Sequence, residues 1–408
     1  MTDPVLVVRA AVALIAAATI VAALARRASL PDSILLVVAG LLGANLFPEI
    51  ALAVTPGLVL GVFVPGLVFA AAYSIDWSDL RPVLGPILAL AIPGVLASAV
   101  VVGFALHLGV GIPLELAFVV GAITAATDPV AVVATMRRLD VPRGLRTLVD
   151  GESLLNDGTG LVLFALAVRA VDAGIGTGEA ALLFVGTIVV SAAVGVAGGL
   201  VAARLIRSTD ERTIQLGISL VTAYGTYQLA DAIGLSGILA SVIAGIALGS
   251  RMRRTEGADV IVREIGDLWD VVAFILTSLV FLLIGFAVRL PSLLGAGGAV
   301  AVGTGGVVLA RALMVYVPAA AVRLWTGAHA LPRGWAHVIF WSGLRGAVAL
   351  AAALSLPGDF PQRELLQQIS FGIVLVTLLV QGVGAPVVVR LALRGAQRPT
   401  ALRSPGGG

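Results

Sequence analysis

The chain is 408 residues long, 59% hydrophobic and only 12% charged, with a mean hydropathy of +1.08. Ordinary soluble domains carry about 25% charged residues, so this composition excludes a soluble enzyme, a disordered chain and a nucleic-acid-binding protein. Cysteine and lysine are absent from the sequence, and all 26 basic residues are arginine. The composition therefore predicts an all-α protein that crosses a lipid bilayer many times.

Apolar segments follow one another along almost the whole chain. If about 17–25 apolar residues between charged or Pro/Gly breaks make one membrane span, the sequence contains thirteen spans. Their expected ranges are residues 4–25, 33–47, 56–73, 83–106, 113–134, 149–171, 178–203, 213–230, 235–250, 265–288, 293–322, 334–356 and 366–393. A single membrane domain is thus predicted for residues 1–395, followed by a disordered tail at 396–408 without a regulatory domain.

The positions of the arginines predict how the spans are oriented. Twenty arginines fall on the side that holds the C-terminus and the loops after odd-numbered spans, whereas four fall on the other side. Because loops rich in positive charge stay in the cytoplasm, we expect the N-terminus outside the cell (plasma) membrane and the C-terminus inside. The remaining two, Arg311 and Arg345, lie within spans, where each needs a partner or a wet cavity.

The fifth span contains an acid next to a proline. The run Thr127-Asp128-Pro129 lies well inside this span, and a proline pushes the preceding residue out of the helical conformation. A helix broken at mid-membrane is tolerated only where its freed backbone faces protein or a cavity, and such breaks form ion and substrate sites in transporters. The plainer interpretation is a proline kink whose following half-helix is capped by Asp128.

The start of the sixth span carries two polar stripes. Glu152 and Asn156 are four residues apart, as are Ser153 and Asp157, so the members of each pair lie on one helix face. Several polar side chains that face one way predict a solvated pocket. Asp150, by contrast, is expected to be only a charge at the helix end.

The twelfth span places Arg345 between Gly343 and Gly346, which predicts a second broken helix. Interrupted spans at matching positions of two opposed halves are typical of transporters built from inverted repeats. The two six-helix repeats would be spans one to six and eight to thirteen, with the seventh as connector. Arg345 would then be the counter-ion of Glu152 or of one of the aspartates.

These groups suit the exchange of a proton for a cation. Burial of a carboxylate favours its protonated form, and hard monovalent cations prefer carboxylate, hydroxyl, amide and backbone oxygens. Asp157, Asp128, Ser153, Thr127 and Asn156 supply this set of oxygens. If the site changes sides only when it is occupied, competition of a proton and a cation for one carboxylate is enough to give exchange.

Three sequence runs resemble the monovalent cation:proton antiporter-1 family, whose bacterial and archaeal members are NhaP-type sodium/proton antiporters. The runs are Thr127-Asp128-Pro129, Glu152-Ser153-Leu154-Leu155-Asn156-Asp157-Gly158 and Gly343-Leu344-Arg345-Gly346-Ala347-Val348, and Ala310-Arg311-Ala312-Leu313 also resembles the family. The resemblance covers essentially all thirteen spans. It implies a homodimer in the lipid bilayer, without a cofactor, that transports Na+ or Li+ against H+.

The resemblance also implies a division of the fold. Spans four to six, at about 83–171, and spans eleven to thirteen, at about 293–393, would form a mobile core. Spans five and twelve would cross where they are unwound, and the core would move like an elevator against a dimerisation part made of the other spans.

Residue roles follow from the same resemblance. Asp157 would be the main carboxylate for the proton and the cation, and Asp128, Ser153 and the Thr127 backbone would complete the Na+ ligands. Asn156 would orient the site.

Charged residues near these ligands would contribute to the net charge of the site. Glu152 would pair with Arg345 as a structural or gating ion pair, and Arg311 would be a counter-charge in the core. Related electrogenic exchangers carry two adjacent aspartates where this chain has Asn156 and Asp157. A single titrating carboxylate therefore predicts electroneutral exchange.

Other functions stay open on the sequence alone. A potassium/proton antiporter or another proton-coupled carrier could use the same scaffold, and a channel would explain Arg345 and the broken helices less well. An intramembrane aspartyl protease could use Asp128 and Asp157, although the sequence contains neither a Tyr-Asp nor a Gly-x-Gly-Asp motif. Three histidines near span ends are either pH sensors or ordinary interfacial residues; they are His107, His329 and His337. Three acids at the start of the tenth span either line an ion funnel or belong to a solvated helix start; they are Glu264, Asp267 and Asp270.

Overall fold

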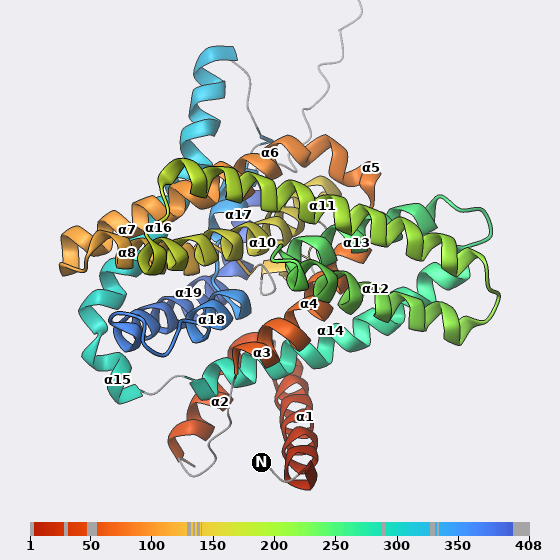
Figure 1. Cartoon of the computed structure of the whole chain (residues 1–408), viewed down its shortest axis with the longest axis horizontal. Helices are drawn as coiled ribbons and strands as arrows, with labels where there is room; N and C mark the ends of the chain where they lie inside the picture. Colours follow the sequence, from red (N-terminus) through yellow and green to blue (C-terminus); the bar gives the residue numbers. More distant parts are fainter. Residues whose placement is uncertain are drawn as a thin grey trace, which may run out of the picture.

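Helices of very different length make up the structure in Figure 1, a computed structural model that describes residues 4–27, 32–46, 55–128, 132–133, 135–136, 139, 141–287, 290–326, 331–332 and 334–394. In chain order they are α1 (Pro4–Arg27), α2 (Asp32–Leu46), α3 (Pro56–Leu58), η1 (Val59–Phe63), α4 (Val64–Ser74), α5 (Trp77–Leu80), η2 (Arg81–Val83), α6 (Leu84–Ala89), η3 (Leu90–Gly94), α7 (Val95–Val110), α8 (Leu114–Ile123), α10 (Arg143–Ala173), α11 (Thr177–Arg207), α12 (Arg212–Ala232), α13 (Gly237–Arg253), α14 (Asp259–Ala287), α15 (Leu290–Gly295), α16 (Gly297–Thr326), α17 (Trp335–Trp341), α18 (Ala347–Leu354) and α19 (Arg363–Arg394). The described residues contain no β-strand.

The all-α membrane fold predicted from composition is confirmed. Every predicted span contains helix, and in the described part of the chain seven helical stretches are long and apolar enough to cross a bilayer. Shorter apolar helices occur at Val12–Ala25, Asp32–Leu46 and Leu114–Ile123. The count of thirteen crossings and the inverted repeats stay predictions, and the tail at 396–408 lies outside the described residues.

Glycines let the helices of the bundle approach closely. A methyl group added at Gly195 of α11 would overlap the carbonyl oxygen of Ala240 in α13, and one added at Gly40 of α2 would overlap the carbonyl oxygen of Leu282 in α14. Small residues are enriched at helix contacts inside membranes because backbone-to-backbone packing replaces the hydrophobic effect there. These contacts fix α11 against α13 and α2 against α14.

The buried apolar residues of the described ranges form two clusters. The larger cluster extends through most of the helices, whereas the smaller one surrounds Trp269 of α14 and Phe69 of α4, whose ring centroids are 4.8 Å apart. In Figure 1, α10 runs through the middle of the bundle and α11 lies across its outer side. This arrangement places the polar stripes of α10 in the interior.

Candidate functional site

The fifth predicted span is broken where the sequence predicts it. Helix α8 ends at Ile123, Thr124 and Ala125 form a turn, and residues 126–128 are not helical. The Thr124 hydroxyl donates to the Val120 carbonyl at 2.8 Å, which completes the last turn. Pro129, to which the prediction assigned the break, lies outside the described residues.

The twelfth span is broken as well, and the two breaks meet. Helix α17 ends at Trp341, α18 begins at Ala347, and residues 343–346 between them are not helical. The backbone N–H of Asp128 donates to the Leu344 carbonyl at 2.8 Å. A methyl group added at Gly346 would overlap the Asp128 carboxylate. Non-helical backbone from both breaks is therefore in direct contact, and glycine at position 346 is required for it.

A hydrogen-bonded network connects α10 to the break after α8. The Asn156 side chain accepts from the Thr127 backbone N–H at 3.0 Å and donates to the Thr127 hydroxyl at 2.5 Å and to Glu152 Oε1 at 2.7 Å. The Ser153 hydroxyl donates to the Thr127 carbonyl. Asn156 thus satisfies the freed backbone N–H of Thr127 with its amide oxygen, since this N–H has no partner within a helix, and its NH2 group holds the Thr127 side chain.

Glu152 forms its ion pair with Arg311, and the expected pair with Arg345 is wrong. Arg311 of α16 donates to the two Glu152 oxygens at 2.8 and 3.0 Å, and both side chains are almost completely buried. It also donates to the Ile339 carbonyl at 2.7 Å. One guanidinium therefore compensates a buried carboxylate and the C-terminal end of α17, where helix carbonyls lack partners.

Arg345 binds the backbone at the other helix break. Its guanidinium donates to the carbonyls of Ala125 and Ala126 at 3.4 and 3.3 Å, and its backbone N–H donates to the Thr377 hydroxyl at 3.2 Å. The C-terminal end of α8 carries a partial negative charge, so Arg345 stabilises the first broken helix as Arg311 stabilises the second. The sequence could not distinguish the two arginines, because both are buried cations near the same acids.

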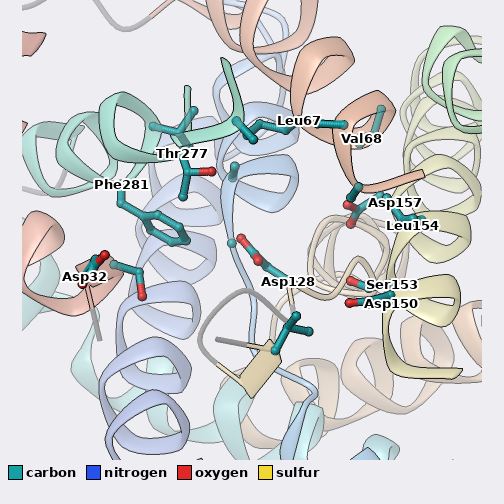
Figure 2. Close-up of a pocket in the computed structure, with 18 of the residues that line it drawn as sticks. Asp32, Leu67, Val68, Asp128, Asp150, Ser153, Leu154, Asp157, Thr277 and Phe281 are labelled. Atoms are coloured by element: carbon teal, nitrogen blue, oxygen red, sulfur yellow. The ribbon is translucent and has the colours of Figure 1, made fainter. Parts of the chain in front are cut away.

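A cavity of about 730 Å³ lies beside the crossing. Asp128, Ser153 and Asp157 line it, whereas Thr127, Asn156 and Glu152 do not. Figure 2 shows Asp157, Ser153 and Asp150 entering from one side, with Asp128 between them and the opposite wall. The predicted site residues therefore separate into a set that faces the cavity and a set that supports the backbone behind it.

Sequence reasoning missed part of the cavity wall. Asp150 is not a helix-end charge, because α10 begins at Arg143 and Asp150 lines the cavity one turn before Ser153 and two turns before Asp157. The spacing i, i+3, i+7 along one helix face could have indicated this. On the far wall, α2 and α14 contribute Asp32 and Thr277, which no local sequence pattern marks as cavity residues.

The remaining polar residues divide between the cavity and other partners. Asp270 lines the cavity, whereas Glu264 binds Arg212 at 2.7 Å. His107 Nδ1 lies 2.8 Å from the Ile112 carbonyl, and His337 Nδ1 lies 2.9 Å from the Tyr316 hydroxyl. His329 is outside the described residues.

Two broken helices that meet inside a helical bundle, next to a cavity lined by carboxylates, define a secondary transporter. The profile of the family described as "Sodium/hydrogen exchanger, transmembrane" matches residues 13–391, and the chain belongs to this family. Membership among transporters, which are not enzymes, shows that the intramembrane protease alternative is wrong.

Individual relatives support the same assignment. The chain is 37% identical to the Na(+)/H(+) antiporter ApNhaP of Aphanothece halophytica, over 91% of this chain and 72% of that protein. It is 30% identical to the Na(+)/H(+) antiporter NhaH of Halobacillus aidingensis, over 93% of this chain and 96% of that protein. The solved structure of the sodium proton antiporter MjNhaP1 from Methanocaldococcus jannaschii shares its fold, with a TM-score of 0.77, 19% identity, and coverage of 95% of this chain and 99% of that one.

Proposed function

We propose that the protein is a Na+/H+ antiporter that exchanges one Na+ or Li+ for one proton, with the two ions competing for Asp157. The observation that carries the proposal is the position of Asp157, which lines the cavity with Asp128 and Ser153 beside the crossing of two broken helices. The names of the relatives support Na+ and H+ as the transported ions. Both ions are substrates, and the proposed exchange uses no cofactor.

Competition follows from the charge of the two aspartates. Two ionised carboxylates in one enclosed site repel each other, and either a proton or a monovalent cation relieves that repulsion. The Ser153 hydroxyl donates its hydrogen to the Thr127 carbonyl and accepts from the Thr127 hydroxyl at 3.4 Å, so one lone pair of its oxygen remains available to a cation. Asp157, Asp128 and Ser153, which line the cavity, are the proposed Na+ ligands. The Thr127 backbone, which the resemblance includes among the ligands, lies behind them, where its carbonyl accepts from the Ser153 hydroxyl.

The supporting residues favour electroneutral exchange. Asn156 is uncharged and is committed to Thr127 and Glu152, and the charge of Glu152 is compensated by Arg311. Replacing one proton by one Na+ then leaves the total charge of the site unchanged. The proposed stoichiometry is one to one.

The place of the cavity supports an alternating-access movement. One wall comes from α10, α18 and α19 of the proposed core, and the other from α2, α4 and α14 of the proposed dimerisation part. The cavity also reaches Asp32, Ser74 and Arg390, which are close to span ends that the arginine pattern assigns to the cytoplasm. We propose that this is the inward-open state of a homodimer, with the N-terminus outside and the C-terminus in the cytoplasm.

The central test is Asp157→Asn in proteoliposomes loaded with a pH-sensitive dye. We expect the wild type to release protons on addition of Na+ or Li+, and the variant to show no cation-dependent proton movement. The matched control is Asp172→Asn, which removes an exposed acid from the end of the same helix and should leave exchange intact. Normal exchange by folded Asp157→Asn, or a response to K+ alone in the wild type, would contradict the proposal.

Electroneutrality has its own measurement. A membrane potential imposed with K+ and valinomycin should leave the rate of Na+/H+ exchange unchanged, because a one-to-one exchange moves no net charge. A rate that rises or falls with the imposed potential would overturn the stoichiometry and leave Na+/H+ exchange itself standing.

A further inference from the structure

The cavity has a second group of oxygen atoms on the wall opposite the proposed ion site. Asp32 and Ser33 of α2 and Thr277 and Ser278 of α14 all line it. Figure 2 shows Asp32 and Thr277 across the cavity from Asp157, with Asp128 between. None of these four residues takes part in the exchange site described above.

Helix packing places the two serines at the same level. Gly40 of α2 lies against Leu282 and Gly285 of α14, and Gly43 lies against Phe286, so the two helices run in parallel. Ser33 is seven residues before Gly40, and Ser278 is seven residues before Gly285. Seven residues are about two helical turns, so both serines lie on the faces along which the helices touch. The group is therefore one cluster, formed by two helices far apart in the sequence.

Within the described residues, the hydroxyls of this cluster have no protein hydrogen-bond partner. Ser33 is only 4% exposed, and its Oγ has no hydrogen-bond partner among the described residues. The same part of the structure gives no protein hydrogen bond to the hydroxyls of Thr277 and Ser278. Thr222 and Thr226 of α12, in contrast, each donate to the carbonyl four residues earlier at 2.7 Å. A buried hydroxyl without a partner is costly, so it indicates a ligand or water in the cavity.

The chemistry of the cluster selects a monovalent cation. One carboxylate from Asp32 and three hydroxyl oxygens are hard ligands, which suit Na+ and Li+. The cluster contains one carboxylate, and divalent cations such as Ca2+ are usually bound by several, so its composition suits a monovalent ion better. Arg390 also lines the cavity and opposes the binding of any second cation.

We propose that Asp32, Ser33, Thr277 and Ser278 form a second monovalent-cation subsite, where the ion binds before it reaches Asp157. The subsite rests on the proposed cation exchange and deepens it. It belongs to α2 and α14, which lie on the dimerisation side of the cavity, so it stays behind when the core moves. Its role is to raise the local cation concentration at the mouth of the exchange site.

Heavy-atom binding tests the subsite directly. The probe is Tl+, soaked into the purified full-length protein and located by anomalous diffraction. We expect one peak at Asp157 and a second peak between α2 and α14. The second peak should persist in Asp157→Asn and disappear in Ser33→Ala/Ser278→Ala. If no second peak forms, or if it survives the double substitution, the subsite does not exist and the polar cluster holds water only.

Transport kinetics give an independent readout. For the double variant we expect the Na+ concentration at half-maximal exchange to rise about two- to tenfold, the range of one or two hydrogen-bond-strength contacts, with an unchanged maximal rate. The matched control is Ser98→Ala, which removes another buried hydroxyl without a partner, outside the cavity, and should change neither value. Thr277→Val, which preserves shape, provides the same test if the double variant does not fold.

These measurements separate the two proposals. Loss of exchange in Asp157→Asn together with an unchanged half-maximal Na+ concentration in the folded Ser33→Ala/Ser278→Ala and Thr277→Val variants would reject the subsite and retain the antiporter. Full exchange by Asp157→Asn would reject the exchange site, whatever the Tl+ peaks show.

Discussion

Helices α10 and α11 follow each other in the chain and are both 31 residues long. Helix α10 buries polar side chains, whereas α11 exposes apolar ones. On α10, Glu152 and Asn156 are only 2% and 1% exposed. On α11, Leu182 and Val189 are 78% and 61% exposed. A hydrocarbon surrounding explains the second helix, because apolar side chains need no protein contact there.

The difference shows where each helix is vulnerable. Several buried polar side chains of α10 depend on a partner from another element, such as Arg311 of α16 for Glu152. Helix α11 depends on close backbone packing at its small residues, and its outward face makes no such demand. We therefore expect substitutions in α10 to destabilise the protein when they remove an ion-pair or hydrogen-bond partner. Substitutions in α11 should destabilise it when they add volume at a close helix contact.

The largest expected effect concerns the buried ion pair of α10. Arg311→Leu leaves Glu152 charged and without its partner, which should lower the free energy of unfolding by about 3–5 kcal/mol. Thermal unfolding of the purified protein in detergent would measure this loss. Glu152→Leu/Arg311→Leu should regain most of the stability, since no uncompensated charge remains, and should still fail to exchange Na+.

The control for that loss is an ion pair at the surface. Arg212 binds Glu264 at 2.7 Å, but the Arg212 side chain is 67% exposed. Arg212→Leu should cost only about 0–1 kcal/mol. Equal losses for Arg311→Leu and Arg212→Leu would refute the view that burial makes the difference.

The second-largest expected effect concerns a methyl group added to α11. Gly195→Ala places a methyl group against the Ala240 carbonyl and should destabilise the protein by about 1–3 kcal/mol. Gly186 on the same helix has no atom within 4 Å of the added methyl, so Gly186→Ala should stabilise by up to about 1 kcal/mol. The same chemical change is thus expected to have opposite signs, and melting shifts in the same direction would contradict the packing argument.

Sequence reasoning could predict both helices as spans, because composition and length decide that property. It also located both breaks, since the glycines around Arg345 and the acid–proline pair at Asp128 act on the local backbone. It failed on the partner of Glu152. That choice depends on which helix packs beside α10, and no local pattern distinguishes Arg311 from Arg345.

The residues of the far cavity wall could not be predicted either, because their position also depends on which helices pack together. Asp32 resembles an ordinary first residue of a helix, and Thr277 resembles an isolated hydroxyl in an apolar span. Only the packing of α2 on α14 brings them to one cavity. Asp150 was misjudged because α10 begins at Arg143, several residues before the apolar run that defined the span.

The smallest expected effects concern two substitutions between threonine and valine, which have nearly the same shape. Thr159 of α10 is buried and donates to the Ala91 carbonyl at 2.6 Å, so Thr159→Val should cost about 0.6–1.7 kcal/mol, the range for hydrogen bonds between membrane helices. Val189→Thr on the outer face of α11 should stay within about 0.5 kcal/mol, because the new hydroxyl can donate to the carbonyl one turn earlier, as Thr222 and Thr226 do at 2.7 Å. Thermal unfolding of both purified variants in the same detergent would compare their losses of stability. If Val189→Thr proved the more damaging substitution, the outer face of α11 would have to be a protein contact instead of a lipid-facing surface.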